Sequence, residues 1–202
     1  MNMIHEFNIN RKLGICTATP LDRNNKAMNL ASKKPDNLLL ELLSHSSICR
    51  KRIDTPDRYS EEYFQGKDRV IVDSVPGSMF MIDIRKMIEY GMYDEDIFLY
   101  GEEKVLGYKF YNSKIETVVL LNKFYKHYHS VSINKNIPSL FKLTKIGIDS
   151  ELIILRKYWN VVGSKLIIAK GFLSLVWVER ILLNLLNQNF SHHLENTIRE
   201  EI

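Results

Sequence analysis

An alternation of strand-like and helix-like segments in the middle of the chain constrains the fold more than any other sequence feature. Short apolar runs, one with the period-two alternation of a half-buried strand, are separated by segments with helical spacing. We expect strands at 70–75, 78–82 and 115–121, and helices at 84–90 and 102–112. This order predicts an α/β fold, whose functional sites gather at strand ends.

Local signals mark the boundaries of these segments. Pro76 and Gly77 break the first run, and the second run, SMFMI, is apolar enough to be a central strand. Asp83 is placed to cap the helix that follows, and Gly91 is placed to end it. We therefore expect a strand, a turn, a second strand and a short helix in direct succession.

The first third of the chain adds one more strand and one more helix. Residues 13–19 form an apolar, β-branched run that predicts a buried strand. The leucine-rich residues 37–48 predict a helix capped by Asp36, with basic residues at 50–52 in the last turn, where the helix dipole favours cations. The densely charged residues 54–69 predict a solvated loop.

The composition fits one globular domain, alone or with a helical appendage. Of the 202 residues, 45% are hydrophobic, which is enough to bury a substantial core. The net charge is only +4 and the basic residues do not form runs, so we expect no nucleic-acid binding. Cys16 and Cys49 are too isolated for a disulfide framework or a metal cluster, and we expect buried free thiols in a reducing compartment.

Two segments bear on the location of the protein. The first 14 residues lack the apolar core of a secretion signal, so we expect a cytoplasmic protein. The most apolar stretch, residues 166–186, is interrupted by Lys170, Glu179 and Arg180, which argues against a helix that spans a membrane. A helix lying on a membrane surface stays open.

The last third of the chain is basic and helical in pattern. Residues 123–170 hold nine Lys and Arg against two acidic residues, and they overlap helical patterns at 148–162 and 164–186. Such a helix pair can dock on the preceding domain, form a dimer or lie on an anionic membrane. The sequence leaves these three alternatives open.

Acidic, aromatic and histidine residues follow one another in a fixed order between residues 91 and 132. The matched positions are Gly91, Tyr93-Asp94-Glu95, Phe98, Tyr100, Glu102-Glu103, Leu106, Lys109, His129 and Ser132. In this order they resemble the C-terminal half of the catalytic domain of family-2 glycosyltransferases of the GT-A type. The similarity is greatest to bacterial, rhamnosyltransferase-like enzymes of capsular and cell-surface polysaccharide synthesis. Residues 75–82 (VPGSMFMI) look like the strand that walls the donor-sugar site in that family.

The resemblance implies a partial GT-A-like, Rossmann-like mixed sheet in residues 1–136, followed by an amphipathic helical tail in residues 137–202. The chain departs from the family in having Glu-Glu where the family has Glu-Asp. It also holds no nucleotide-binding βαβ unit and no Asp-x-Asp motif at the expected place, since Asp94-Glu95-Asp96 comes after the wall strand. We therefore expect a truncated or split enzyme that needs a complementing chain and is inactive alone.

The resemblance also assigns roles to individual residues. Glu103 is the expected catalytic base, with Glu102 as its neighbour or alternate. Gly77, Ser78 and Tyr100 are expected to bind substrate. His129, or alternatively His127, is expected to hold a divalent cation, Mn²⁺ or Mg²⁺.

Each assigned residue also has a plain structural reading. The two glutamates complement a helix dipole, worth about 0.3–1 kcal/mol each. The Gly-Ser pair makes an ordinary turn, and a histidine at a strand end makes surface hydrogen bonds. The two readings differ in whether residues 103 and 129 face one shared cleft.

The expected reaction is inverting transfer of a sugar from a nucleotide-sugar donor to a cell-surface polysaccharide or lipid-linked glycan acceptor, at the inner face of the cell membrane. The alternative is a noncatalytic module, derived from such an enzyme, that associates with membranes or with itself. A homodimer is compatible with both functions.

Overall fold

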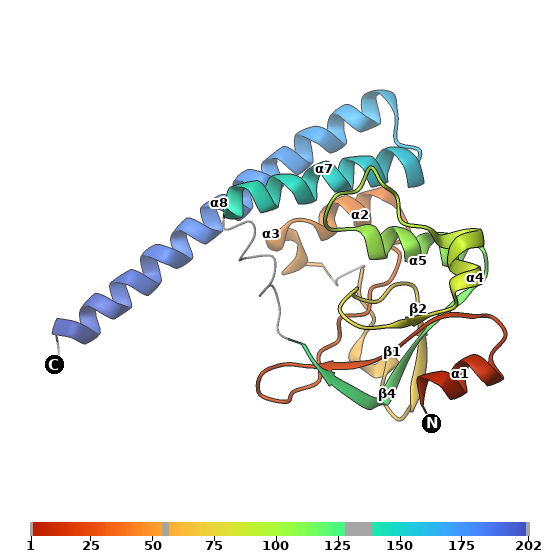
Figure 1. The fold of residues 1–202 in the computed structure, drawn as a ribbon. Coiled ribbons are helices and arrows are strands. Elements are labelled where there is room, and N and C mark those ends of the chain that lie inside the picture. Colours follow the sequence, from red (N-terminus) through yellow and green to blue (C-terminus); the bar gives the residue numbers. More distant parts are fainter. Residues whose placement is uncertain (1, 54–56, 128–138, 201–202) are drawn as a thin grey trace.

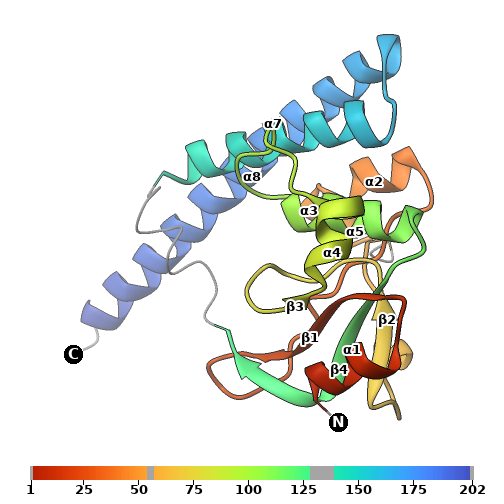
Figure 2. The same ribbon diagram turned by 45° about the vertical axis from the view of Figure 1, so that its right-hand side comes forward.

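The structure is a computed structural model and describes residues 2–53, 57–127 and 139–200. A four-stranded sheet forms one end of the molecule, two long helices form the other, and shorter helices lie between them (Figures 1 and 2). The strands are β1 (Leu13–Leu21), β2 (Arg69–Val72), β3 (Met81–Ile82) and β4 (Glu116–Lys126). The predicted α/β class is confirmed.

The sheet is mixed, with the order β2-β4-β1-β3. The central strands β1 and β4 run parallel, and the edge strands β2 and β3 are antiparallel to their neighbours. Parallel neighbours need a crossover connection, and here residues 22–115 supply it. This long crossover carries the edge strands and the shorter helices of the central layer.

Strand β1 and residues 117–120 of β4 are buried on both faces of the sheet. On one face, helix α1 (Met3–Ile9) covers a cluster formed by Leu13, Cys16, Val118 and Leu120. On the other face, helix α5 (Glu102–Asn112) packs Leu106 and Phe110 against residues of β1, β2 and β4. Successive residues of a strand point to opposite faces, so two faces of apolar partners require the apolar runs seen in β1 and β4.

The free cysteines fit the sequence interpretation in part. Cys16 is fully buried in β1, and burial, with the nearby Glu6 carboxylate adding to it, raises its pKa to about 12. Cys49 is only half-buried. Cys16 is therefore an inert core thiol.

The predicted central strand at 78–82 is wrong. Only Met81 and Ile82 form β3, which pairs with β1 alone at the edge of the sheet. The run is short because the turn after Pro76 and the cap at Asp83 leave little chain between them. In addition, the Thr17 hydroxyl donates a hydrogen bond of 2.5 Å to the Met79 carbonyl, where a longer strand would make backbone pairs.

The single helix expected at 37–48 is divided into α2 (Leu38–Ser44) and α3 (Ser47–Arg50). Asn37, and not Asp36, caps α2, because its side-chain oxygen accepts the N–H of Leu40 at 3.0 Å. Ser46 interrupts the helix because its hydroxyl accepts the N–H of Cys49 at 3.1 Å and begins α3. Short polar side chains that bond to nearby backbone compete with helix continuation in this way.

The predictions for the Asp83 cap, α5, β4 and the charged loop agree more closely with the structure. Asp83 caps α4 (Ile84–Lys86), which continues as the π-helical turn η2 (Met87–Gly91). Helix α5 begins and ends where expected, and β4 follows it but runs five residues beyond the predicted end at Leu121. The described part of the predicted loop, residues 57–68, holds one 3₁₀ turn, η1 (Glu61–Tyr63).

The C-terminal region is a hairpin of two helices, α7 (Leu140–Tyr158) and α8 (Gly163–Glu200). Trp159 and Val162, predicted on the helical face, lie in the connection between them. The hairpin shares cores with the rest of the chain, since Leu155 and Leu173 pack against Leu42 of α2. Within the described ranges, no helix is long and apolar enough to cross a membrane.

Candidate functional site

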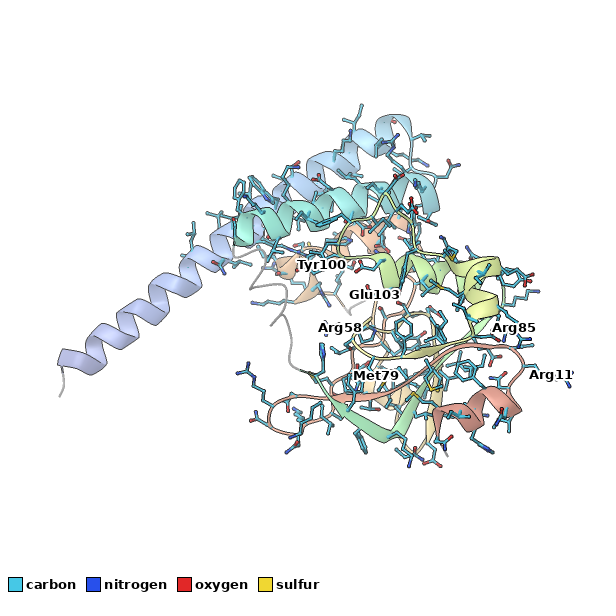
Figure 3. All side chains as sticks on the ribbon, in the orientation of Figure 1. Arg11, Arg58, Met79, Arg85, Tyr100 and Glu103 are labelled. Atoms are coloured by element: carbon cyan, nitrogen blue, oxygen red, sulfur yellow. The ribbon has the colours of Figure 1, made fainter. Side chains whose placement is uncertain are left out.

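A cleft of about 820 Å³ lies between the helical hairpin, the start of α5 and the turn after β2. Figure 3 shows Tyr100 and Glu103 between the hairpin and the sheet, and both side chains line this cleft. The polar and charged lining also includes Ser32, His45, Ser74, Lys104, Glu151 and Arg180. The structure thus brings two of the predicted site residues to one cavity.

Glu103 is held at the cleft wall from the turn that follows β2. Its Oε1 atom accepts the N–H of Gly77 at 2.9 Å, and its backbone carbonyl accepts the hydroxyl of Ser74 at 3.0 Å. A Cβ atom on Gly77 would lie 2.2 Å from this same Oε1. The close approach that Gly77 permits is therefore made by Glu103, whereas the sequence interpretation reserved it for a sugar.

A strained turn directly before α5 positions Tyr100 and Glu103 at the cleft. Tyr100 and Gly101 both have positive φ angles, 66° and 99°, directly before the first residue of α5. A non-glycine residue in this region costs on the order of 1 kcal/mol, so other contacts have to hold it. The hydroxyl of Ser150 in α7 supplies one, donating 2.7 Å to the carbonyl of Leu99.

Glu102 does not line the cleft, although it precedes Glu103. Its Oε2 atom is buried without a hydrogen-bond partner among the described residues. Burial raises the pKa of Glu102, its own backbone N–H opposes this effect, and the charge of Glu103 adds to it. The two glutamates of the pair thus have different environments.

Ser78 and His127 meet at a different place, around Tyr125. The hydroxyl groups of Ser78 and Tyr125 are 2.6 Å apart, and the Tyr125 and His127 rings have centroids 6.3 Å apart. His127 follows β4 directly, as predicted, but neither it nor Ser78 lines the cleft. His129 lies outside the described residues, so its meeting with Glu103 stays a prediction.

A buried cluster of charged side chains forms part of the cleft floor. Glu41 comes from α2, His45 is the residue that caps the C-terminus of α2, Lys104 comes from α5 and Glu151 from α7. The Lys104 ammonium pairs with Glu41 and lies 3.0 Å from Glu151 Oε2, and His45 Nε2 lies 3.3 Å from that same oxygen. The Tyr108 hydroxyl donates to Glu41 at 3.2 Å, so the charged cluster joins three helices.

Mutual attraction favours the ionised forms of Glu151, Lys104 and His45 despite their burial. Burial alone would raise the pKa of Glu151, but Lys104 and His45 outweigh it and lower that pKa. Burial alone would lower the pKa of Lys104 and of His45, but the Glu151 and Glu41 carboxylates outweigh it and raise both. The charges of these three side chains therefore stabilise one another.

Glu41, His45 and Glu151 form a group that could hold a metal ion, since one ligand atom from each lies within 4.8 Å of the others. Lys104 bonds to both carboxylates of this group. An ion bound there would have to displace the Lys104 ammonium from its two partners. The Lys104 ammonium is therefore already the cation of this group.

The sequence interpretation missed this charged cluster, although one signal was present. Glu41 is the one polar residue within a leucine run, LLLELL. His45 follows it at the i+4 spacing that places both on one helix face. A carboxylate on the apolar face of a helix requires a buried partner. The sequence does not reveal that Lys104 and Glu151 are those partners.

A smaller basic pocket of about 220 Å³ adjoins the cleft and shares Lys104 and Arg180 with it. Lys33, Lys34 and Arg50 also line the basic pocket, and Asp57 is the one acidic residue in its described lining. Arg180 donates to the His45 carbonyl at 3.0 Å and has no carboxylate within 4.0 Å among the described residues. Burial and the neighbouring Arg50 lower its pKa, against the opposing charge of Glu179.

The Asp94-Glu95-Asp96 segment is bonded to the C-terminal end of α7. Asp94 accepts hydrogen bonds from Lys157 at 2.9 Å and from the Tyr158 hydroxyl at 2.8 Å, and Lys157 also pairs with Asp96. These partners hold the pKa of Asp94 below its usual value, although its burial acts in the opposite direction. Both aspartates therefore have a cationic partner in α7.

Comparisons with models of known protein families, with curated proteins and with solved structures gave no match to this chain. The function of the cleft therefore rests on its residues and their geometry.

Proposed function

We propose that the cleft binds a sugar and that the chain is the acceptor-side part of a GT-A-type glycosyltransferase of family 2. One observation carries the proposal: Glu103 lines a cleft large enough for a sugar, at the position that the resemblance gives to the catalytic base. Tyr100 lines the same cleft and offers a ring and a hydroxyl to a sugar. The proposed acceptor is a lipid-linked glycan at the inner face of the cell membrane.

In the proposed reaction the Glu103 carboxylate takes the proton of an acceptor hydroxyl. The hydroxyl oxygen attacks the anomeric carbon of the donor and forms the new glycosidic bond. The bond from that carbon to the diphosphate breaks, and the diphosphate leaves with the electron pair. General-base catalysis of this kind contributes about 10²–10⁴-fold to a rate.

The basic pocket suits the departing diphosphate. It adjoins the cleft that Glu103 lines, and its described lining has five cationic side chains against one carboxylate. Arg180, which lacks a carboxylate partner in the described part of the chain, is the group best placed to bind a phosphate oxygen. Positive groups at this place would neutralise charge as it develops on the leaving group.

A divalent cation, Mn²⁺ or Mg²⁺, is part of the proposal as the partner of the diphosphate. Bound there, such an ion would neutralise phosphate charge. The Glu41–His45–Glu151 group offers three ligand atoms, but Lys104 pairs with both of its carboxylates. We therefore propose that Lys104 keeps its place and that the ion enters with the phosphate groups.

Titration calorimetry with three probes, inorganic pyrophosphate, a nucleoside diphosphate and farnesyl diphosphate, each with Mn²⁺, tests the proposal. Binding of the nucleoside diphosphate points to the donor side, and preference for farnesyl diphosphate points to the lipid-linked acceptor. Arg180→Gln is expected to weaken binding at least about tenfold, because it removes a charge-assisted contact. Arg156→Gln, at an exposed arginine of α7, is the matched control. Failure of all three probes to bind would overturn the proposal.

A further inference from the structure

Helix α8 has apolar side chains on two faces, and the described residues cover one of them. Ala169, Leu173 and Val176 are at most 2% exposed, and the first two pack against α2 and α7. The opposite face carries large aliphatic side chains that remain 44–71% exposed. We call this second face the α8 strip, and it consists of Ile167, Ile168, Gly171, Leu175, Val178, Leu182, Leu185 and Leu186.

The α8 strip follows the spacing of a helix–helix interface. From Ile168 to Leu185 its members are alternately three and four residues apart, which is the heptad spacing of paired helices. The strip is about 27 Å long at 1.5 Å per residue. At Gly171 nothing lies within 4 Å of the place a Cβ atom would take, so the strip has a dent there that a partner's side chain can fill.

We propose that two copies of this chain associate through the α8 strip. Seven large aliphatic side chains of the strip remain 44–71% exposed, and a second copy that covers them would remove this apolar surface from water. Because α7 lies behind the covered face of α8, such a dimer joins two hairpins into a four-helix arrangement. This proposal stands apart from the sugar-binding cleft and does not depend on it.

The charge pattern of α8 favours a second copy over a lipid surface. A helix lying on an anionic membrane carries Lys and Arg along the border of its apolar face. Between residues 171 and 186, none of the exposed side chains of α8 is charged. The exposed lysines of this helix, Lys165 and Lys170, both precede that segment. An uncharged strip suits another apolar strip better than phospholipid headgroups.

Sedimentation velocity of the full chain over a hundredfold range of concentration tests the proposal. The wild type is expected to reach twice the chain mass of 23.7 kDa. The double substitution Leu175→Glu with Leu182→Glu puts charges into the strip and is expected to raise the dimer dissociation constant at least about 100-fold. Both leucines are more than half exposed, so the folded monomer tolerates the change. Lys170→Glu, outside the strip on the same helix, is the matched control and is expected to leave the dimer intact.

Three outcomes would overturn the proposal. The first is a wild-type chain that stays monomeric at every concentration. The second is a dimer that survives the double substitution, because the interface would then lie elsewhere. The third is a wild-type monomer that co-floats with vesicles of phosphatidylcholine and phosphatidylglycerol. In this outcome, the double variant Leu175→Glu with Leu182→Glu no longer binds the vesicles. That result would assign the strip to a membrane. Circular dichroism confirms that each variant is folded.

Discussion

Glu103 and Lys104 are neighbours in α5, yet they belong to two regions with opposite properties. Lys104 lies in the buried charged cluster, paired with carboxylates from α2 and α7. Glu103 points to the cleft wall, where its carboxylate accepts a hydrogen bond from the Gly77 N–H. One step along a helix turns the side chain by about 100°, so the two residues have different partners, although both line the cleft.

The difference distinguishes charges that hold the fold from a charge that is open to a ligand. Removing one partner of a buried pair leaves an uncompensated charge, so each member of the charged cluster is needed by the others. Among the described residues, Glu103 belongs to no such buried pair. The same helix can therefore hold the fold with one residue and present the next one to the cleft.

Lys104→Met is expected to have the largest effect on stability. It leaves Glu41 and Glu151 buried without their ammonium partner, which costs about 3–5 kcal/mol of unfolding free energy. Urea unfolding measures the loss. Lys109→Met, on the same helix at a lysine bonded to the Met92 carbonyl, is the control and should cost about 1 kcal/mol or less. Equal effects of the two substitutions would mean that the charged cluster does not hold the helices together.

Gly107→Ala is expected to have the next largest effect on stability, because α5 approaches the backbone that follows β2 at this glycine. A Cβ atom there would lie 2.3 Å from the Asp73 carbonyl oxygen, and overpacking costs about 1–3 kcal/mol. Gly77→Ala meets only the movable end of the Glu103 side chain, so its cost should be smaller. Thermal unfolding of both variants compares the two contacts. A larger loss for Gly77→Ala would show that Glu103 is fixed in the fold.

The pH dependence of stability should report on His45. Its pKa is raised in the folded protein, so the stability it contributes is full below the unfolded pKa of about 6.5 and is lost as pH rises through the folded pKa. Urea unfolding at several pH values above 6.5 should show a declining free energy of unfolding. His45→Gln should flatten that decline, and an unchanged slope in this variant would contradict the assignment.

Glu103→Gln should affect stability least, by less than about 1 kcal/mol. The substituted side chain keeps an oxygen that can accept the Gly77 N–H, so only the charge of one hydrogen bond is lost. Urea unfolding beside Lys104→Met compares neighbouring residues directly. A loss as large as that of Lys104→Met would place Glu103 among the structural charges and remove the contrast between the two regions.

Local signals in the sequence predicted the parts of the fold that depend on local contacts. The cap at Asp83, the bounds of α5 and the apolar strand near residues 13–19 all follow from side chains a few positions apart. The choice of Asn37 over Asp36 as a cap could not be predicted, because both residue types cap well and only the entry angle of the chain decides.

The candidate site shows the same division. The sequence placed Glu103 and Tyr100 at the start of α5, and both line the cleft. It missed the charged cluster because Lys104 is 63 residues from Glu41 and 47 from Glu151. Contacts at such distances depend on how α2, α5 and α7 pack, and no local pattern encodes that packing.

The most direct test of the account is a crystal structure of the chain soaked with a nucleoside diphosphate sugar and Mn²⁺. The expected result is the donor sugar in the cleft, with its anomeric carbon facing the Glu103 carboxylate, and the diphosphate against Arg180. A sugar bound away from this cleft, or a diphosphate that leaves Arg180 untouched, would contradict it.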